Sequence, residues 1–433
     1  MNASPVAGVV AGGVAAPADT SPHAPSAGGA PAPARPIRLL VFTTLYPDAE
    51  RPRHGIFVEE RLRHLVASGR IEATVVAPVP WFPLRHRHFG AYATFARVPA
   101  QELRHGIRVL HPRYPVIPKV GMNIAPGLMY RSLLPLLRRL ATEGSGFDLI
   151  DAHYFYPDGV AAARLGEVLG KPVVITARGS DVNVIAHYPL PARQIRWAAE
   201  RAGAIVTVSE ALKSKVGAMG VQAGKVVTLR NGVDTDRFRP LERADIRARL
   251  DLAGPVWLAV GNLVELKGVH ITLAALARAN DATLLIVGDG PERARLQGQV
   301  RQLGLDARVR FLGTIAQAQL VDFYNAADVL VLASSREGMP NVVLESLACG
   351  TPVVAAPFDG VSELLTAPEA GEIAAERSAE AIAAACCRLQ ERAPARAATR
   401  AFAQQLGWRP VVKAQCALYA KVLAEDGRKG LGG

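Results

Sequence analysis

Two glutamates, Glu337 and Glu345, stand eight positions apart in a stretch that reads REGMPNVVLESLACGTPVV. A glycine and a proline closely follow Glu337, and two such strong breakers indicate a loop at the first carboxylate. The next segment predicts a short helix with Asn341 as its N-cap and Gly350 just past its end, so Glu345 lies inside it. Residues 351–356 then predict a buried strand. The sequence therefore places one carboxylate in a loop and the other on a helix.

Three kinds of chemistry fit this pair of carboxylates. Ligands of open α/β sheets bind at the carboxyl ends of strands, and a helix N-terminus there favours phosphate. A carboxylate accepts hydrogen bonds from sugar hydroxyls, so phosphate and sugar together indicate a nucleotide sugar. A solvated helix face or a cap would explain two such acids without any ligand. A glycosidase pair stands roughly 5–10 Å apart, whereas eight helical residues span about 12 Å, and spacing alone does not decide between these readings.

Apolar runs typical of buried parallel strands occur along the chain in two series. The first series comprises residues 37–43, 73–79, 107–110, 147–153, 173–176, 204–208 and 226–229. The second comprises residues 256–261, 283–288, 309–313, 329–333 and 352–356. Helical segments alternate with these runs, at residues 159–169, 269–279, 292–303, 316–327 and 341–349. This repeated pattern predicts an α/β protein of two Rossmann-like domains with a ligand in the cleft between them.

A charged segment at residues 240–254 joins the two halves and is the expected domain boundary. The first domain is therefore predicted over residues 36–240 and the second over residues 254–405. Residues 406–427 are amphipathic and predict a helix that returns to the first domain. Residues 1–35 are rich in Ala, Pro, Gly and Ser, a composition that predicts a disordered tail.

Composition limits the class of protein. The chain has 433 residues, which suits two domains, and 50% of them are hydrophobic, enough for two substantial cores. No apolar run reaches the roughly 18 residues of a membrane helix, and residues 6–16 lack the basic flank of a secretory signal. Cysteines occur without metal-ligand or disulfide spacing, which predicts reduced, buried thiols in a cytoplasmic protein; they are Cys349, Cys386, Cys387 and Cys416.

The positive charge of the chain is concentrated in its first half. The net charge is +12, and residues 36–140 hold 16 Lys and Arg against 6 Asp and Glu. Residues 81–89, WFPLRHRHF, mix aromatic with basic side chains, and residues 116–137 are largely apolar. This combination suits an anionic membrane surface, an acidic acceptor or nucleic acid, although no nucleic-acid module is present. A solvated basic face without a partner remains an alternative.

Seven motifs occur in an order that makes the chain resemble the retaining glycosyltransferases of family 4, also called glycosyl transferases group 1. These motifs are TTLYPDAERPRHGIFVEER, DAHYFYPDGVAA, ITARGSDVN, LRNGVDTDRF, VGNLVELKG, LIVGDGPE and REGMPNVVLESLACGTPVVA. The resemblance covers residues 37–423. It implies the GT-B fold, in which two Rossmann-like domains face each other and a C-terminal helix crosses back to the first.

The resemblance assigns donor-binding roles in the second domain. Glu337 would contact the hydroxyls of the donor sugar near the reacting carbon, and Glu345 would accept both ribose hydroxyls. Lys267 would pair with the diphosphate and stabilise the leaving group as its charge develops. The segment of Gly338, Met339, Pro340 and Asn341 would offer backbone N–H groups to the sugar and diphosphate.

One position departs from the family pattern. Where this family often has an arginine, the chain has Asn262, which donates hydrogen bonds but supplies no charge. The diphosphate would then rely on Lys267 alone, or on an arginine of the first domain such as Arg178.

In the first domain, the counterpart of His153 in the family lies near the donor sugar and the β-phosphate. Asp158 and Asp181 would shape the acceptor side of the cleft or hold His153. Gly55, in a loop after the first strand, would let the backbone approach the donor phosphate.

Two further motifs are interpreted as decoys. Asp234-Thr235-Asp236 matches a metal-binding pattern of another glycosyltransferase fold, but further ligands of the kind hard cations need are lacking, so no metal is predicted. Gly288-Asp289-Gly290-Pro291 lacks the third glycine of a dinucleotide loop, so neither NAD nor another cofactor is predicted.

Together these features predict a cytoplasmic, metal-independent glycosyltransferase that moves a sugar from a nucleotide-diphosphate donor to an acceptor hydroxyl with retained configuration. Glu337, His153 and Lys267 would carry catalysis, with Arg178, Asp158 and Asp181 on the acceptor side. The basic, aromatic first half favours a lipid-linked or membrane-associated saccharide acceptor in exopolysaccharide, capsule or lipopolysaccharide biosynthesis, at the inner face of a membrane. A nucleotide-sugar epimerase of the same fold, or a non-catalytic nucleotide-sugar binder, are the alternatives.

Overall fold

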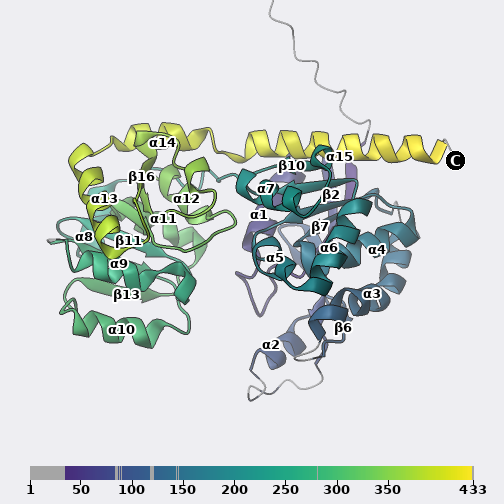
Figure 1. Ribbon diagram of the computed structural model, residues 1–433, viewed down its shortest axis with the longest axis horizontal. Coiled ribbons are helices and arrows are strands. Elements are labelled where there is room, and N and C mark those ends of the chain that lie inside the picture. The colour runs from purple at the N-terminus through teal and green to yellow at the C-terminus, as the bar shows by residue number, and fades with distance from the viewer. Residues whose placement is uncertain are drawn as a thin grey trace, which may run out of the picture. The chain divides into compact units, whose positions relative to one another are not determined.

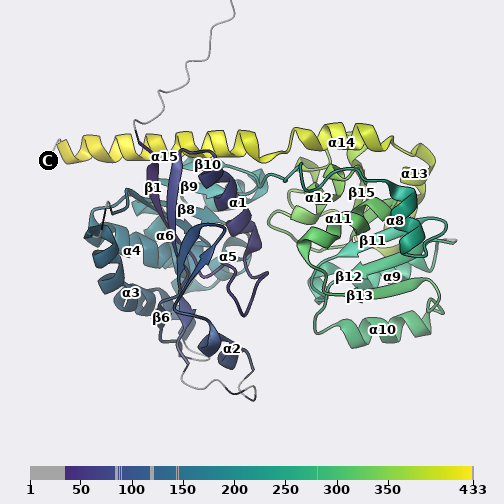
Figure 2. The same ribbon diagram turned by 180° about the vertical axis from the view of Figure 1, so that it is seen from behind.

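The computed structural model describes residues 35–82, 86, 88, 90–117, 121–142, 144, 146–279 and 281–431. Almost all of the predicted tail, and Arg85 and Arg87 of the basic aromatic segment, lie outside the described residues. The described chain forms two largely parallel sheets, each with helices on both faces (Figure 1, and from behind in Figure 2). The predicted α/β class is therefore confirmed.

The first sheet has eight strands in the order β10-β9-β8-β7-β1-β2-β5-β4, and every neighbouring pair is parallel except β4 with β5. The strands are β1 (Ile37–Phe42), β2 (Ile71–Val76), β4 (Gln101–Arg104), β5 (Ile107–Leu110), β7 (Leu149–His153), β8 (Val173–Ala177), β9 (Ala204–Thr207) and β10 (Val226–Thr228). The central strands β7, β8 and β9 are buried along their whole length because helices cover both sides of the sheet, which explains their unbroken apolar sequences.

Helices from distant parts of the chain cover the two faces of this sheet. One face packs on α3 (Ala125–Thr142), α4 (Val160–Leu169), α6 (Pro189–Arg201) and α7 (Glu210–Ala218). The other face packs on α1 (Ile56–Ala67) and on α15 (Trp408–Leu431), the yellow helix beside the C label in Figure 1. The final helix therefore completes the core of the first domain.

The second sheet has six parallel strands in the order β13-β12-β11-β14-β15-β16. They are β11 (Val256–Val260), β12 (Thr283–Val287), β13 (Val309–Gly313), β14 (Val329–Leu332), β15 (Val353–Ala355) and β16 (Gly371–Ile373). One face packs on α9 (Val269–Leu276), α10 (Arg293–Gln302) and α13 (Ala379–Arg392). The other packs on α11 (Gln317–Ala326), α12 (Asn341–Ala348) and α14 (Arg396–Gln404).

Shorter elements connect these layers. The helical ones are α2 (Ala91–Arg97), α5 (Ser180–Asn183), α8 (Arg243–Arg249), η2 (Gly121–Ile124), η3 (Phe155–Gly159), η4 (Ile185–His187), η5 (Ala223–Lys225), η6 (Glu265–Lys267), η7 (Val361–Glu363) and η8 (Pro368–Ala370). A separate pair of parallel strands is formed by β3 (Val79–Pro80) and β6 (Arg113–Tyr114). The charged connector between the halves forms α8, whose Arg243 and Arg247 both pair with Asp328 of the second domain.

Three local predictions differ from the structure. Asn341 is the first residue of α12 rather than its N-cap, because the extended backbone at Pro340 ends the preceding loop one residue earlier. The run at 73–79 is divided between β2 and β3, and the apolar stretch 116–137 contributes to both surface and core: Ile117, Met122 and Ile124 are exposed, whereas one face of the helix that follows is buried. Its helix α3 buries Met129, Leu133 and Leu137 at helical spacing against the first sheet.

Two further observations bear on the class of protein. All four cysteines are free thiols, and three of them, Cys349, Cys386 and Cys416, are buried. Among the described residues, no helix is both long enough and apolar enough to cross a membrane.

Candidate functional site

Loops that follow strands of both sheets line one cleft of about 440 Å³. The first domain contributes Leu45, Phe57, Tyr154, Arg178, Ser180, Asn183, Val208 and Asn231. The second contributes Leu266, Lys267, Arg336, Glu337, Gly338 and Met339. Because parallel strands carry their loops at one edge of each sheet, residues that are far apart in sequence meet here.

Lys267 and Glu337 form an ion pair in this cleft. The Lys267 Nζ atom lies 2.6 Å from Glu337 Oε1, and the Ser334 hydroxyl donates to the same oxygen at 2.7 Å. Both side chains are only partly exposed, at 24% and 11%. An anionic ligand that approached Lys267 would compete with Glu337 for the ammonium, and Glu337 would then be free to accept hydroxyl donors.

Glycines bring the two loops that carry this ion pair together. Lys267 ends η6, and Gly268 follows it in the left-handed region at φ 68°. A Cβ atom at Gly268 would lie 2.0 Å from the carbonyl oxygen of Ala333, the residue after β14. Only glycine therefore allows the turn after β11 to pack against the end of β14, where the loop to Glu337 begins.

A second close approach joins the two domains. A Cβ atom at Gly338 would lie 2.1 Å from the carbonyl oxygen of Arg178, and one at Gly179 would lie 3.0 Å from the Gly338 Cα atom. Gly179 has φ 134°, a conformation that other residues rarely adopt. The loops after β8 and β14 thus touch backbone to backbone at the cleft.

Glu345 lies on α12 and is 8% exposed. Its Oε2 accepts a hydrogen bond from the Tyr324 hydroxyl at 2.8 Å, and its Oε1 accepts one from Gln317 Nε2 at 3.3 Å. Burial raises the pKa of Glu345, although these two donors oppose the shift. Glu345 does not line the cleft that Glu337 lines. The two acids therefore do not flank one cavity as a glycosidase pair would.

The other predicted donor-binding residues of the second domain fall in different places. Met339 lines the cleft, and Pro340 is the residue before α12. The Asn341 Oδ1 atom accepts a hydrogen bond at 2.8 Å from Asn231 Nδ2 of the first domain. Asn262 is exposed and outside the described lining of the cleft, whose cations are Arg178, Lys267 and Arg336.

His153 ends β7 and is 2% exposed. Its Nε2 lies 3.1 Å from Asp151 Oδ2, and its Nδ1 lies 2.7 Å from Arg178 Nη2. Because a guanidinium only donates and a carboxylate only accepts, the ring carries its proton on Nε2. Burial and the nearby guanidinium of Arg178 lower the pKa of His153, although Asp151 opposes the shift. The imidazole is therefore neutral, with both nitrogens engaged inside the protein.

The two aspartates predicted on the acceptor side, Asp158 and Asp181, accept hydrogen bonds from backbone amides. Asp158 Oδ2 accepts from the Thr44 amide at 2.9 Å and from its hydroxyl at 2.8 Å, which fixes the loop after β1. Burial raises the pKa of Asp158 to about 7. Asp181 accepts from four backbone amides, of Phe155, Arg178, Gly179 and Val182. One alternative expected these aspartates to hold His153, but neither forms a hydrogen bond with it.

Gly55 precedes α1 with φ 70°, and a Cβ atom there would lie 2.2 Å from the Leu45 carbonyl oxygen. The glycine therefore lets the start of α1 pack against the loop after β1. Leu45 lines the cleft, so this contact places the loop at the site.

Several site residues were missed by sequence reasoning. Asp151 stands two positions before His153, and the alternation of a strand puts both on one face, which was a readable signal. Tyr154 adopts φ 83° and its hydroxyl lies 2.7 Å from Ser180 Oγ. Arg336 immediately precedes Glu337, and Asn231 stands in the LRNGVDTDRF motif, but neither residue was assigned a role from the sequence.

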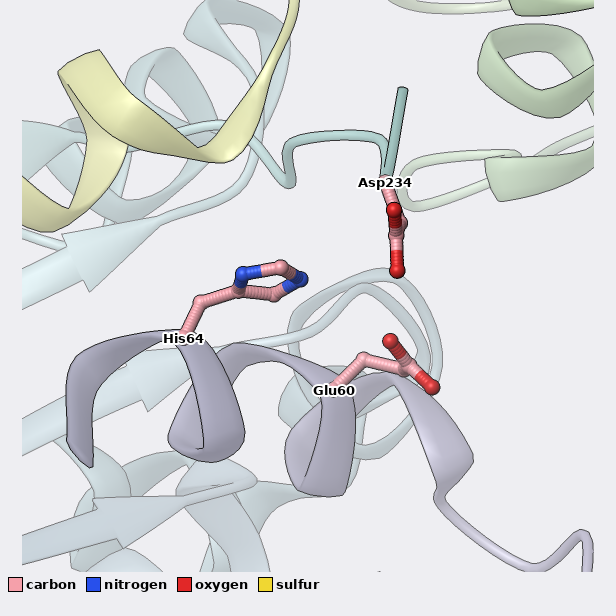
Figure 3. A group of neighbouring side chains, drawn as sticks. All are labelled: Glu60, His64 and Asp234. Carbon is pink, nitrogen blue, oxygen red and sulfur yellow. The ribbon is translucent and has the colours of Figure 1, made fainter. Parts of the chain in front are cut away.

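The Asp-x-Asp segment contributes to one cluster that resembles a metal site. The ligand atoms of Glu60, His64 and Asp234 lie within 4.8 Å of one another, and the three side chains point toward a common space (Figure 3). The guanidiniums of Arg237 and Arg63 lie 3.0 and 3.1 Å from Glu60 Oε1. Two arginines therefore already neutralise these acids, a donor set that does not favour a cation.

Family comparisons agree with this architecture. The model "Glycosyltransferase Family 4" matches residues 54–237, and the model "Glycosyl transferases group 1" matches residues 242–406. TuaC of Bacillus subtilis, whose name assigns it to teichuronic acid biosynthesis as a glycosyltransferase, is 31% identical over 347 residues, 76% of this chain and 83% of TuaC. The "D-inositol 3-phosphate glycosyltransferase 2" of Catenulispora acidiphila is 30% identical over 370 residues, 78% and 86% of the two chains.

Solved structures share the fold. Sucrose-phosphate synthase of Thermosynechococcus elongatus superposes with a TM-score of 0.73 at 22% identity, over 90% of this chain and all of that chain. Anabaena Alr3699/HepE in complex with UDP superposes with a TM-score of 0.67 at 23% identity, over 89% of this chain and 100% of that chain. Two Rossmann-like domains with a cleft lined from both are the GT-B architecture, and the chain belongs to glycosyltransferase family 4.

Replacing Gly338 by alanine tests the close approach of the two loops. The added Cβ atom would clash with the Arg178 carbonyl and push the loop that carries Glu337 away by about 1 Å, so we expect kcat/KM to fall about a hundredfold. The rate of glycosyl transfer by the variant and the wild-type chain, measured under the same conditions, checks this. Gly298→Ala in α10 is the control, because nothing lies within 4 Å of that Cβ position. Full activity in Gly338→Ala would show that the approach is dispensable.

Proposed function

We propose that the chain is a retaining, metal-independent glycosyltransferase that moves a sugar from a nucleotide-diphosphate donor to an acceptor hydroxyl. The observation that carries this proposal is the Lys267–Glu337 pair at 2.6 Å in a cleft lined by both domains. A cation is suited to a leaving diphosphate, and the adjacent carboxylate to sugar hydroxyls. Solved complexes of Alr3699/HepE with UDP and UDP-glucose, which share the fold, support a nucleotide-sugar donor.

A front-face displacement accounts for retention without a covalent intermediate. The bond from the anomeric carbon to the β-phosphate oxygen breaks, and its electron pair leaves with the nucleoside diphosphate. The acceptor oxygen bonds the same face of the carbon, and its proton passes to the departing phosphate oxygen. In this scheme Lys267 stabilises the charge on the diphosphate, and Arg178 lies across the cleft as the second cation. Glu337, paired with Lys267, orients the sugar rather than attacking it.

The donor contacts beyond the cleft belong to the same proposal. Glu345 is proposed to bind the ribose, and its bonds to Tyr324 and Gln317 leave acceptor capacity on both carboxylate oxygens. Arg178 is proposed to supply the charge that Asn262 lacks. No cofactor is proposed, because Lys267 and Arg178 are proposed to stabilise the charge on the leaving diphosphate.

The acceptor is proposed to be a saccharide, or a lipid-linked saccharide, of polysaccharide biosynthesis. Similarity to TuaC, named for teichuronic acid, and to WcaL of Escherichia coli, named for colanic acid, supports this class. The 16 Lys and Arg against 6 Asp and Glu over residues 36–140 are compatible with an acidic or membrane-bound acceptor.

A panel of UDP-, GDP- and ADP-sugars, with binding and product formation followed together, tests the function. A transferase turns over one donor and is accelerated by a saccharide acceptor. An epimerase would convert the donor without an acceptor, and a non-catalytic binder would bind it unchanged; either result would overturn the proposal.

Replacing the ion pair tests its role in transfer. We expect Lys267→Ala and Glu337→Gln each to lower kcat by about a hundredfold or more, because each removes a group that acts on the donor in the transition state. The surface pair Lys213 and Glu210, 3.8 Å apart on α7, supplies the matched controls Lys213→Ala and Glu210→Gln. Near-normal turnover in both Lys267→Ala and Glu337→Gln would contradict the assignment of this ion pair to sugar transfer.

A membrane surface is proposed as a further partner of the first domain. Apolar side chains are exposed on the segments around β3, α2, β6 and η2. Strand β3 contacts α2 and β6, and α3 contacts β6 and η2. In both ribbon views α2 and β6 lie together (Figures 1 and 2). The exposed fractions are 57% for Trp81, 46% for Ile117, 41% for Met122 and 46% for Ile124. Exposed aromatic and aliphatic groups in a basic region suit an anionic lipid surface.

Cosedimentation with vesicles checks this partner. We expect the chain to bind vesicles that contain phosphatidylglycerol and not vesicles of phosphatidylcholine alone. The triple change Trp81→Ala, Arg85→Ala and Arg87→Ala should weaken binding at least tenfold, since each basic residue contributes about 1 kcal/mol at an anionic surface. Leu103→Ala, at an apolar side chain that is 74% exposed on β4, is the control. Indifference to anionic vesicles would favour a water-soluble acceptor.

A further inference from the structure

The C-terminal helix α15 reaches the buried polar groups beneath the cleft. Tyr419, halfway along it, is completely buried and belongs to the core formed by α1 and one face of the first sheet. The Tyr419 hydroxyl donates to Asp151 Oδ2 at 2.8 Å, although 268 positions separate the two residues. A side chain from the end of the chain is thereby bonded to the strand that carries His153.

Asp151 depends on this hydroxyl. Its Oδ2 takes both of its bonds, from Tyr419 and from His153 Nε2, while its Oδ1 is buried and has no partner among the described residues. A buried carboxylate that accepts so few hydrogen bonds costs free energy. Loss of the bond from Tyr419 would therefore strengthen the demand of Asp151 on its remaining donor, His153. Without Tyr419, the His153 N–H would be the only hydrogen-bond donor to this carboxylate within the described part of the chain.

From Asp151 the chain of bonds continues into the cleft. His153 donates to Asp151 and accepts from Arg178 at 2.7 Å, so the direction of each bond fixes the next. Arg178 lines the cleft, and its Nη1 also donates to Asn231 Oδ1 at 3.2 Å. Asn231 in turn donates to Asn341, at the start of α12.

A second branch anchors the hydroxyl itself. Gln415, one turn before Tyr419, donates to the tyrosine oxygen, and its Oε1 accepts from Arg61 Nη1 at 2.9 Å. Arg61 is 1% exposed and also donates to Asn231 Oδ1 at 3.2 Å. With its one proton given to Asp151, the Tyr419 hydroxyl has a single orientation.

We propose that Tyr419 is a positioning residue for sugar transfer: by donating to Asp151 it holds His153 as the Nε2–H tautomer and so aims the Arg178 guanidinium into the cleft. This inference rests on the proposed function, and it assigns to α15 a part in the reaction that packing alone would not require.

The charges around the pair determine the direction of a pH effect. Three groups act on Asp151 and His153: Arg61 of α1, Arg178 after β8 and Tyr419 of α15. Asp181 of α5 acts on Arg178. Burial lowers the pKa of Arg178 to about 9 and that of Arg61 to about 10, so both are cations near neutral pH. Burial would raise the pKa of Asp151, but His153, Tyr419 and Arg178 together hold it below its usual value.

Removing the Tyr419 hydroxyl therefore makes the pair a stronger base. An Asp151 carboxylate with one donor fewer has a higher pKa, and it also stabilises a protonated His153 better. Transfer needs the ionised Asp151 and the neutral His153. As the pH is lowered, the variant without the hydroxyl should therefore lose activity at a higher pH than the wild-type chain does.

The test compares Tyr419→Phe with Tyr46→Phe, a control that removes another buried hydroxyl but one without a partner among the described residues. We expect Tyr419→Phe to lower kcat/KM at neutral pH about tenfold and to move the acid limb of its pH profile up by about one unit. Tyr46→Phe should leave the limb in place. A purely structural role for Tyr419 predicts a lower yield or stability with an unmoved limb, and that result overturns the proposal.

A measurement without substrate separates this inference from the proposed function. Ring ¹⁵N–¹H spectra of histidine-labelled protein, with His153 assigned from a His153→Gln sample, report its tautomer and its titration. We expect the Nε2–H form in wild type and Tyr46→Phe, and protonation at higher pH in Tyr419→Phe. If His153 behaves alike in all three, the positioning role is wrong even if transfer is confirmed. If no nucleotide sugar turns over while the spectra shift, it is the transferase assignment that fails.

Discussion

The buried guanidinium of Arg178 is the constraint around which the site is arranged. A charge taken out of water must be met by hydrogen bonds and counter-charge, or it destabilises the fold. Here His153 and Asn231 meet it directly, and Asp151 and Asp181 supply negative charge nearby. Its own carbonyl oxygen lies against Gly338, so satisfying this one side chain also brings the loops of the two domains together.

The ion pair of Lys267 and Glu337 follows a different logic from that of Arg178. Both partners are partly exposed, with one further donor from Ser334, so a ligand can exchange for either of them at modest cost. The first domain thus presents a fixed cation, and the second an exchangeable one. In the proposed reaction a diphosphate is bound and then released, and one fixed and one exchangeable contact suit that cycle.

The sequence predicted the buried strands better than it predicted the hydrogen bonds between residues far apart in the chain. Apolar runs such as 147–153 and 173–176 located β7 and β8 to within a residue or two because both strands are covered on two faces. Edge and surface elements such as β4 and β16 were missed, since their burial is partial and no periodicity marks it. The motifs located Lys267, Glu337 and Arg178, all of which line the cleft. What they could not give was long-range pairing: nothing local to Asp151 indicates Tyr419, and nothing local to Asp181 indicates four backbone amides. Such contacts depend on how distant elements pack.

The position of α15 has a consequence for synthesis. A ribosome delivers this helix only after both sheets have emerged, yet one face of the first sheet is covered by α1 and α15 together. Until α15 has been made, the nascent first domain exposes one apolar face of its sheet, and Asp151 lacks the hydrogen bond from Tyr419. A chain that stalled before α15 would therefore carry every cleft residue and still lack part of the first domain's core, so this core is completed only once α15 has been synthesised.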